Sequence, residues 1–179
     1  MDDVRPVMAD LVAVALRISG QLLQCGREDF QPFAVALTSH GCHLCFVFDK
    51  ADFLPVLAAQ PQVTEQREPG VIAMGPSMTT ECLTANQAEG MHFWTRHAAL
   101  IERLRQLAVS QEIIASAVVY RENEEDDQGR PQPLVQVELE HATGWTLLWS
   151  QPHQLVGGKL QIGEVAQYEH ESEVFHPDE

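Results

Sequence analysis

Positively charged residues are scarce in this chain. Its 179 residues include 11 Lys and Arg against 26 Asp and Glu, which gives a formal net charge of -15. Neutralising the phosphates of a nucleic acid requires a surplus of Lys and Arg, and so does docking on an anionic membrane surface. The composition therefore argues against a nucleic-acid-binding protein and against a protein that binds a membrane surface.

Targeting and membrane signals are also lacking. Asp2 and Asp3 stand where a secretion signal has a basic region. The apolar stretch 7–23 contains Asp10 and Arg17, and we expect it to be too polar and too short to span a bilayer. These features predict a cytoplasmic protein.

The motifs of the commonest cofactor and hydrolase sites are absent too. The chain has no G-x-G-x-x-G, no G-x-x-x-x-G-K-[ST], no G-x-S-x-G and no H-E-x-x-H. We therefore expect no cofactor, and an enzyme is the less favoured interpretation.

The chain has only four cysteines, and without a secretion signal we expect them to be reduced thiols. They are Cys25, Cys42, Cys45 and Cys82. The run His40-Gly41-Cys42-His43-Leu44-Cys45 offers four potential zinc ligands. Successive side chains of a strand alternate between its two faces. Cys42 and Cys45 are three residues apart, so they would point to opposite faces and would not reach one ion. We expect His40, Cys42, His43 and Cys45 to be ordinary strand and turn residues, with no metal site.

Two long amphipathic helices are predicted. The first runs from Arg5 or Pro6 to Cys25, since Pro6 suits a first turn and Gly26 suits the position just past the end. The second starts at a cap provided by Thr84 or Asn86 and ends near Ser110. Its predicted apolar stripe consists of Met91, Trp94, Ala98, Ile101, Leu104 and Ala108.

The predicted strands cluster in two parts of the chain. They cover 33–38, 42–49, 113–120, 134–141 and 145–150, with short strands at 71–74 and 79–83, an edge strand within 159–168 and a short helix near Asp52. The linker 121–133 is predicted to be an exposed loop. Clustered rather than alternating elements favour an α+β fold, in which an antiparallel sheet of about five or more strands carries both long helices on one face. We expect residues 1–163 to form a single domain and 164–179 an acidic, flexible C-terminal tail.

Paired carboxylates supply the best catalytic candidates. Glu138 and Glu140 would share a strand face with Cα atoms about 7 Å apart, and His141 and His153 follow them in the chain. Such a pair can act as acid and base. Alternating acids are also typical of a solvated sheet face, and no nucleophile or oxyanion donor accompanies them. A small enzyme or small-ligand-binding domain that uses these four residues is therefore the alternative interpretation.

Three short segments carry a family resemblance: Pro32-Phe33-Ala34, the residues from Ile114 to Ala117, and Val137-Glu138-Leu139-Glu140-His141 before a glycine turn. They resemble a group of small bacterial cytosolic α+β proteins to which no activity is attached. The resemblance implies a bacterial cytosolic α+β protein and brings no cofactor, catalytic residue or partner with it.

The favoured function is that of a binding protein for a basic partner. An acidic surface steers encounters with basic proteins, and the immunity proteins that neutralise bacterial toxins resemble this type of small acidic domain. The contact candidates are Glu122, Glu124, Glu125, Asp126, Asp127, Trp145 and Trp149. The two tryptophans are core residues if their strand face packs on a helix and partner anchors if it is open. A homodimer formed through an edge strand or this face is a further option.

Overall fold

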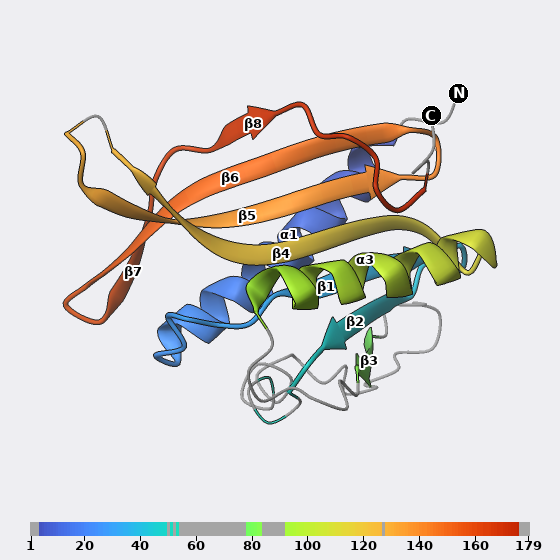
Figure 1. Ribbon diagram of the computed structural model, residues 1–179, viewed down its shortest axis with the longest axis horizontal. Helices are drawn as coiled ribbons and strands as arrows, with labels where there is room; N and C mark the ends of the chain where they lie inside the picture. The colour runs from blue at the N-terminus through green and yellow to red at the C-terminus, as the bar shows by residue number, and fades with distance from the viewer. Residues whose placement is uncertain are drawn as a thin grey trace, which may run out of the picture.

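The computed structural model describes residues 4–49, 51, 53, 78–83, 92–126 and 128–175. In this part of the chain two helices and one eight-stranded mixed sheet form an α+β fold (Figure 1). The helices are α1 (Arg5–Gln24) and α3 (Phe93–Val109). The strands are β1 (Phe33–Thr38), β2 (His43–Val47), β3 (Met78–Cys82), β4 (Ile113–Glu125), β5 (Pro131–His141), β6 (Trp145–Val156), β7 (Lys159–Ile162) and β8 (Ala166–Tyr168).

The sheet has the order β3-β2-β1-β4-β5-β6-β7, and β8 also pairs with β6. Every pairing is antiparallel except that of β2 with β3. The expected antiparallel sheet is thus mostly correct, and the sheet is mixed because β3 runs in the direction of β2. A parallel neighbour needs a long crossover, and the chain between β2 and β3 is long enough to provide one.

Helix α1 confirms the predicted bounds to within one residue. Its buried face contains Leu11, Ala15, Ile18 and Leu22, at steps of three or four. Gly26 ends the helix with a φ of +76°, a conformation that glycine adopts without a steric penalty.

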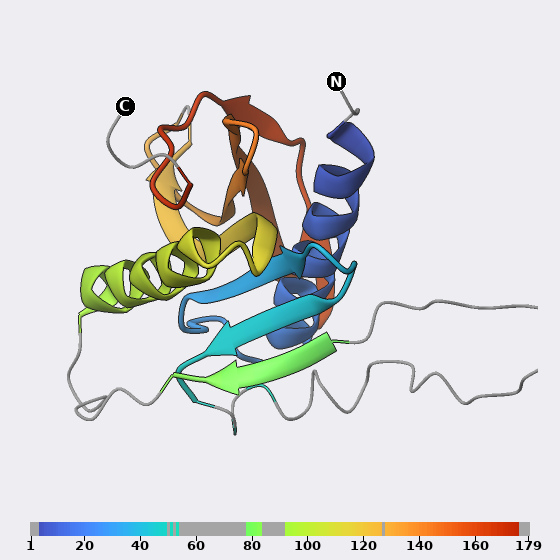
Figure 2. The ribbon, with the colours of Figure 1, turned by 90° about the vertical axis from the view of Figure 1, so that its right-hand side faces the viewer.

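The two helices cover opposite faces of the sheet, so the expectation that they share one face is wrong. The α1 side of β1 carries Phe33, Val35 and Leu37, whereas the α3 side carries Ala34 and Ala36. In Figure 1, α3 lies in front of β1 and α1 passes behind β4, and Figure 2 shows the same separation from the side. The physical reason lies in the sequence of β1. Its first five residues are all buried, so both faces of this central strand need an apolar cover.

Helix α3 is rotated relative to its predicted stripe. Its buried residues are His97, Leu100, Ile101, Leu104 and Leu107. Trp94, which the prediction turned inward, is 67% exposed, and Ala98 is exposed as well. The predicted stripe left out His97, which the structure buries. The proposed caps Thr84 and Asn86 lie outside the described residues, and the described helix begins at Phe93.

The long β4–β5 hairpin replaces the predicted loop 121–133. Strand pairing continues to Glu125↔Pro131, which leaves only a short turn. Asp126 organises this turn, because its carboxylate accepts hydrogen bonds from the backbone N–H of Gln128 and Arg130 and pairs with the Arg130 guanidinium. Glu122, Glu124 and Glu125 of the linker are therefore held on β4.

The described part of the C-terminal segment also packs on the domain. Strand β8 pairs with β6, and Val174 is buried against α3. Residues 169–175, which we call the C-terminal strap, cross from β8 toward α3 (Figure 1). The tail expected over 164–179 thus differs from the structure up to Phe175. The strand predicted at 71–74 and most of the short helix predicted near Asp52 lie outside the described residues.

By length and composition alone, α1 would qualify to cross a membrane, with 20 residues and a mean hydropathy of 1.4. This differs from the expectation that the stretch 7–23 is too short and too polar. Half of the qualifying window is buried inside the fold. The buried face packs on β1, β4 and β5, and buried core helices satisfy the same criterion.

Candidate functional site

The α3 side of the sheet holds a buried carboxylate, Glu138, on β5. It accepts a hydrogen bond of 2.7 Å from His97 Nε2 and one of 2.9 Å from the Tyr120 hydroxyl. Burial first, then the negative charge of Glu138 and the hydrogen bond, raise the pKa of the Tyr120 phenol. The rings of Phe93 and Trp94 pack around His97. Both oxygens of Glu138 are thus occupied inside the protein.

Glu140 anchors the C-terminal strap. It is 2% exposed and accepts hydrogen bonds from the Ser172 hydroxyl and from the backbone N–H of Glu173, Val174 and Phe175. Burial raises the pKa of this carboxyl, but the bonds from His170, Glu173, Ser172 and Val174 outweigh burial and lower the pKa to about 2. Glu140 is therefore an ionised structural anchor.

The four catalytic candidates do not converge. Glu138 and Glu140 share a face as expected, yet both are buried rather than solvated. His141 lies at the turn, with its Nδ1 2.9 Å from the Thr143 hydroxyl. On β6, Leu148 is the partner of Glu138. His153 comes five residues after Leu148, so it lies roughly 17 Å along β6 from the position opposite Glu138. No shared cavity joins the four residues among the pockets of the described chain.

The four metal candidates lie in different surroundings. Cys45 is buried in the α1-side core, where burial raises the pKa of its thiol to about 12. His43 is also on this side, with Nε2 3.1 Å from Asp10 Oδ2 of α1, and burial lowers its pKa. His40 is exposed in the turn, and Cys42 is half-buried. Within the described residues, no three His, Cys, Asp or Glu side chains are arranged to hold a metal ion.

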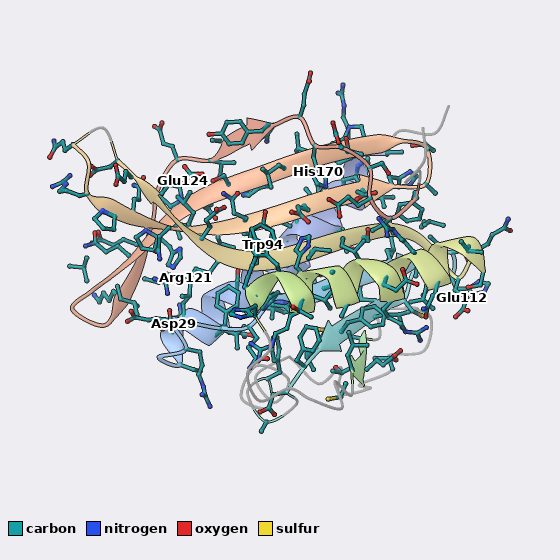
Figure 3. All side chains as sticks on the ribbon, in the orientation of Figure 1. Asp29, Trp94, Glu112, Arg121, Glu124 and His170 are labelled. Carbon is teal, nitrogen blue, oxygen red and sulfur yellow. The ribbon has the colours of Figure 1, made fainter. Side chains whose placement is uncertain are left out.

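The acidic contact candidates lie at the free end of the β4–β5 hairpin. Glu122, Glu124 and Glu125 are exposed, and Asp126 is tied to Arg130. Glu122 lies 3.5 Å from Gln136 Nε2, while the carboxylates of Glu124 and Glu125 have no ion pair within the described part of the chain. Asp127 lies outside the described residues. Figure 3 shows Glu124 near one end of the molecule and Glu112 at the other.

The two tryptophan candidates lie on the other face. Trp145 and Trp149 are partly buried and pack against the α1-side core. This position corresponds to the core interpretation of their strand face. The acidic surface at the hairpin end is formed without them.

A groove opens beside the acidic hairpin end, where β5 and β6 diverge. Their pairing stops at Leu134↔Pro152, and from His153 onward β6 pairs with β7 instead. The groove has a volume of about 550 Å³. Its lining includes Asp126, Arg130, Gln132, Pro133, His153 and Gln161. We call it the fork groove.

A second, smaller recess lies behind the fork groove and shares His153 with it. The end of α1, β4, β5 and β6 meet there, around a volume of about 150 Å³. Burial and the charge of Arg121 lower the pKa of His153 to about 4, so its imidazole is neutral at pH 7. We call this space the Arg121–His153 recess.

Several residues of these sites escaped the sequence analysis. His97 and Tyr120 pair with Glu138 from different elements, and His170 lies 3.7 Å from Glu140 although it was assigned to a tail. The sequence feature that could have indicated these partners is the presence of Glu138 and Glu140. Two acids in a strand otherwise rich in Val and Leu indicate buried partners when the strand is central in its sheet.

Comparisons with known proteins give no relative from which a function could be transferred. No protein-family model, no curated protein and no solved structure matches this chain.

Proposed function

We propose that this protein is a binding domain for a basic polypeptide segment, which it contacts at the free end of the β4–β5 hairpin. The observation that carries the proposal is the pair of exposed carboxylates of Glu124 and Glu125 on β4, which form no ion pair with the residues that the structure describes. Carboxylates held on a hairpin offer a fixed array to incoming Lys and Arg side chains, and an acidic field speeds the encounter with a basic partner.

The charge distribution along the chain supports the same surface. From Glu122 to Phe175 the sequence contains eleven acidic and two basic residues. One of the two, Arg130, is paired with Asp126. The segment from the end of β4 to the strap, less than a third of the chain, therefore carries much of the net negative charge.

The fork groove extends this surface. Asp126 lines it and directly follows the exposed acids of β4. Pro131, Pro133 and Pro152 also line it and have no N–H to donate, so the addition of a full strand is disfavoured. A partner segment would instead place side chains in the groove, with its cations on the acidic rim.

A synthetic octapeptide of alternating Lys and Ala provides the test. We expect saturable shifts of backbone amide resonances in residues 122–133 when the peptide is titrated into the ¹⁵N-labelled protein. The affinity should fall as NaCl is raised toward about 0.15 M, where the Debye length is about 8 Å. An alternating Glu and Ala peptide should cause no such shifts.

A matched pair of double variants localises the binding. Glu124→Gln/Glu125→Gln should weaken the Lys peptide at least about fivefold, since each exposed ion pair contributes up to about 1 kcal/mol. Glu102→Gln/Glu112→Gln removes the same charge from exposed positions on α3 and the turn after it, and should change the affinity less than twofold. Equal effects of both doubles would mean unlocalised attraction and would contradict the proposal.

The narrowest form of this proposal is an immunity-like protein that acts in the cytoplasm and covers the basic active site of an enzyme. Its motivation is the same acidic hairpin end. This form of the proposal requires that one basic enzyme lose its activity when it forms a stoichiometric complex with the protein. The enzyme should remain active when the protein carries Glu124→Gln/Glu125→Gln.

A further inference from the structure

The Arg121–His153 recess is formed by parts of the chain that are distant in sequence. Leu23 comes from α1, Arg121 from β4, Pro133 from β5, and His153 and Leu155 from β6. Glu28 and Gln154 complete the lining. Figure 3 shows Arg121 beside Asp29 at this corner of the molecule.

Two buried nitrogens of the recess lack a hydrogen-bond partner within the described part of the chain. The Nη1 of Arg121 donates to the Glu28 carbonyl and to Asp29 Oδ1, but its Nε–H has no acceptor. The Nδ1 of His153 makes no hydrogen bond of normal geometry there either, although the Gln151 backbone interacts with the ring, and this residue is only 6% exposed. Buried polar atoms without partners are rare in native proteins, because leaving one unpaired is unfavourable.

The chemistry of these two nitrogens selects the kind of ligand. The Arg121 Nε–H can only donate, so its partner must be an acceptor. The guanidinium is always charged, so it favours an anionic oxygen and repels a cation. A neutral imidazole can donate from Nδ1 in one of its two tautomers. An anion with two oxygens offers one acceptor to each of these groups.

The size and walls of the recess narrow the ligand further. A volume of about 150 Å³ exceeds the roughly 10–15 Å³ needed for one water and falls below the roughly 300 Å³ at which drug-sized pockets begin. Leu23, Pro133 and Leu155 supply apolar walls. These walls favour a short alkyl group attached to the anion over a bare inorganic ion.

We propose that the Arg121–His153 recess binds a small aliphatic carboxylate, with its oxygens on Arg121 Nε and His153 Nδ1 and its alkyl group against Leu23, Pro133 and Leu155. The proposal does not rest on the proposed function, since it assigns an anion where the hairpin end takes cations, although the recess shares Pro133, His153 and Gln154 with the fork groove.

The test follows the side-chain nitrogens of the full-length wild-type protein by NMR. Propionate, acetate and inorganic phosphate are titrated separately at constant pH and constant ionic strength. We expect saturable shifts of the His153 imidazole and of the Arg121 Nε–H, with propionate binding more tightly than acetate or phosphate. The imidazole of His141, which lies at a distant turn, is the internal control.

Two variants add a second readout. His153→Phe keeps a ring and removes both nitrogens, and Arg121→Lys keeps the charge and removes the Nε–H fork. Each should weaken propionate at least about tenfold, as expected for a lost hydrogen bond to a charged group. Arg103→Lys, on α3 and outside both linings, should change the affinity less than twofold.

Three results would overturn the proposal. The first is the absence of saturation at His153 with all three anions, which would mean that water alone fills the recess. The second is an equal shift of His141, which would indicate a general anion effect. The third is phosphate binding more tightly than propionate, which would contradict the carboxylate assignment. The wild-type titration decides each of these even if a variant fails to fold.

Discussion

At the residue scale, His153 makes the fold sensitive to mild acid. Burial and the Arg121 charge lower its pKa from 6.5 to about 4. A histidine with a lowered pKa in the folded state contributes stability above pH 6.5 and loses it as the pH falls toward 4. The unfolded chain takes up the proton across this window while the folded chain does not.

We therefore predict that His153→Phe flattens the pH dependence of stability between pH 6.5 and 4. The wild type should lose up to about 3 kcal/mol across this window through His153, and the variant should lack this component. Urea unfolding at a series of pH values measures it. His141→Phe is the control, because His141 is half-buried and its lowered pKa arises from burial alone. Identical pH profiles of wild type and His153→Phe would contradict the prediction.

The Tyr120 hydroxyl is the second residue with a defined energetic role. It donates to the buried Glu138, whose other oxygen binds His97. Tyr120→Phe should lower the free energy of unfolding by about 1–3 kcal/mol, because a buried carboxylate loses a donor. Tyr168→Phe on β8, which removes an exposed hydroxyl, should change it by less than about 0.5 kcal/mol. An equally small decrease in the free energy of unfolding in both variants would show that the hydrogen bond from Tyr120 to Glu138 does not stabilise the fold.

At the element scale, the C-terminal strap depends on one carboxylate. Glu140→Gln replaces an acceptor by an amide that turns an NH₂ toward backbone donors, so we predict a loss of about 2–4 kcal/mol and faster amide exchange at residues 173–175. Glu169→Gln removes the same charge from an exposed position of the same segment and serves as the control.

The pH dependence of strap protection has a definite sign. Because the pKa of Glu140 is lowered to about 2, its contribution is fully present above the ordinary value of 4.5 and is lost as the pH falls toward 2. His170 acts in the opposite direction. Burial lowers its pKa, but the Glu140 carboxylate 3.7 Å from its Nε2 and the nearby Glu138 and Glu173 raise it above 6.5, so its contribution is lost as the pH rises through that raised pKa. The protection factor of the Val174 amide, which is its intrinsic exchange rate divided by its observed rate, should therefore be highest in mildly acidic solution. Protection that is unchanged from pH 3 to 9 would contradict this assignment.

Elements with a strong local pattern could be predicted from the sequence. Helix α1 and strand β1 have the expected bounds because a proline, a glycine and regular apolar spacing mark them. The placement of α3 could not be predicted, because it depends on His97 being buried by Glu138, a partner 41 residues away. The packing of the C-terminal strap could not be predicted for the same reason. Its acids indicated solvent, and the bonds from its backbone to Glu140 leave no trace in composition.

For the candidate sites too, features within one segment could be predicted from the sequence, and contacts between distant segments could not. The acids of the hairpin end are visible in the sequence, although the chain was expected to form a loop there and forms strands instead. The Arg121–His153 recess was not visible, because its lining comes from α1, β4, β5 and β6 and no local motif connects these elements.

At the scale of the whole molecule, the excess of acidic residues should make stability depend on salt. A net charge of -15 on a folded 179-residue chain produces self-repulsion that ions screen. We predict that the thermal midpoint rises as NaCl is increased from low concentration to about 0.15 M. For a chain of this size, each kcal/mol corresponds to roughly 2–4 °C. Glu124→Gln/Glu125→Gln should raise the midpoint at low salt and gain less from NaCl, since it removes two exposed negative charges that have no ion pair among the described residues. Calorimetry of the wild type and the double variant across a salt series provides the measurement. A wild-type midpoint that falls with NaCl would mean that ion pairs such as Arg103–Glu81 and Arg121–Asp29 outweigh the repulsion.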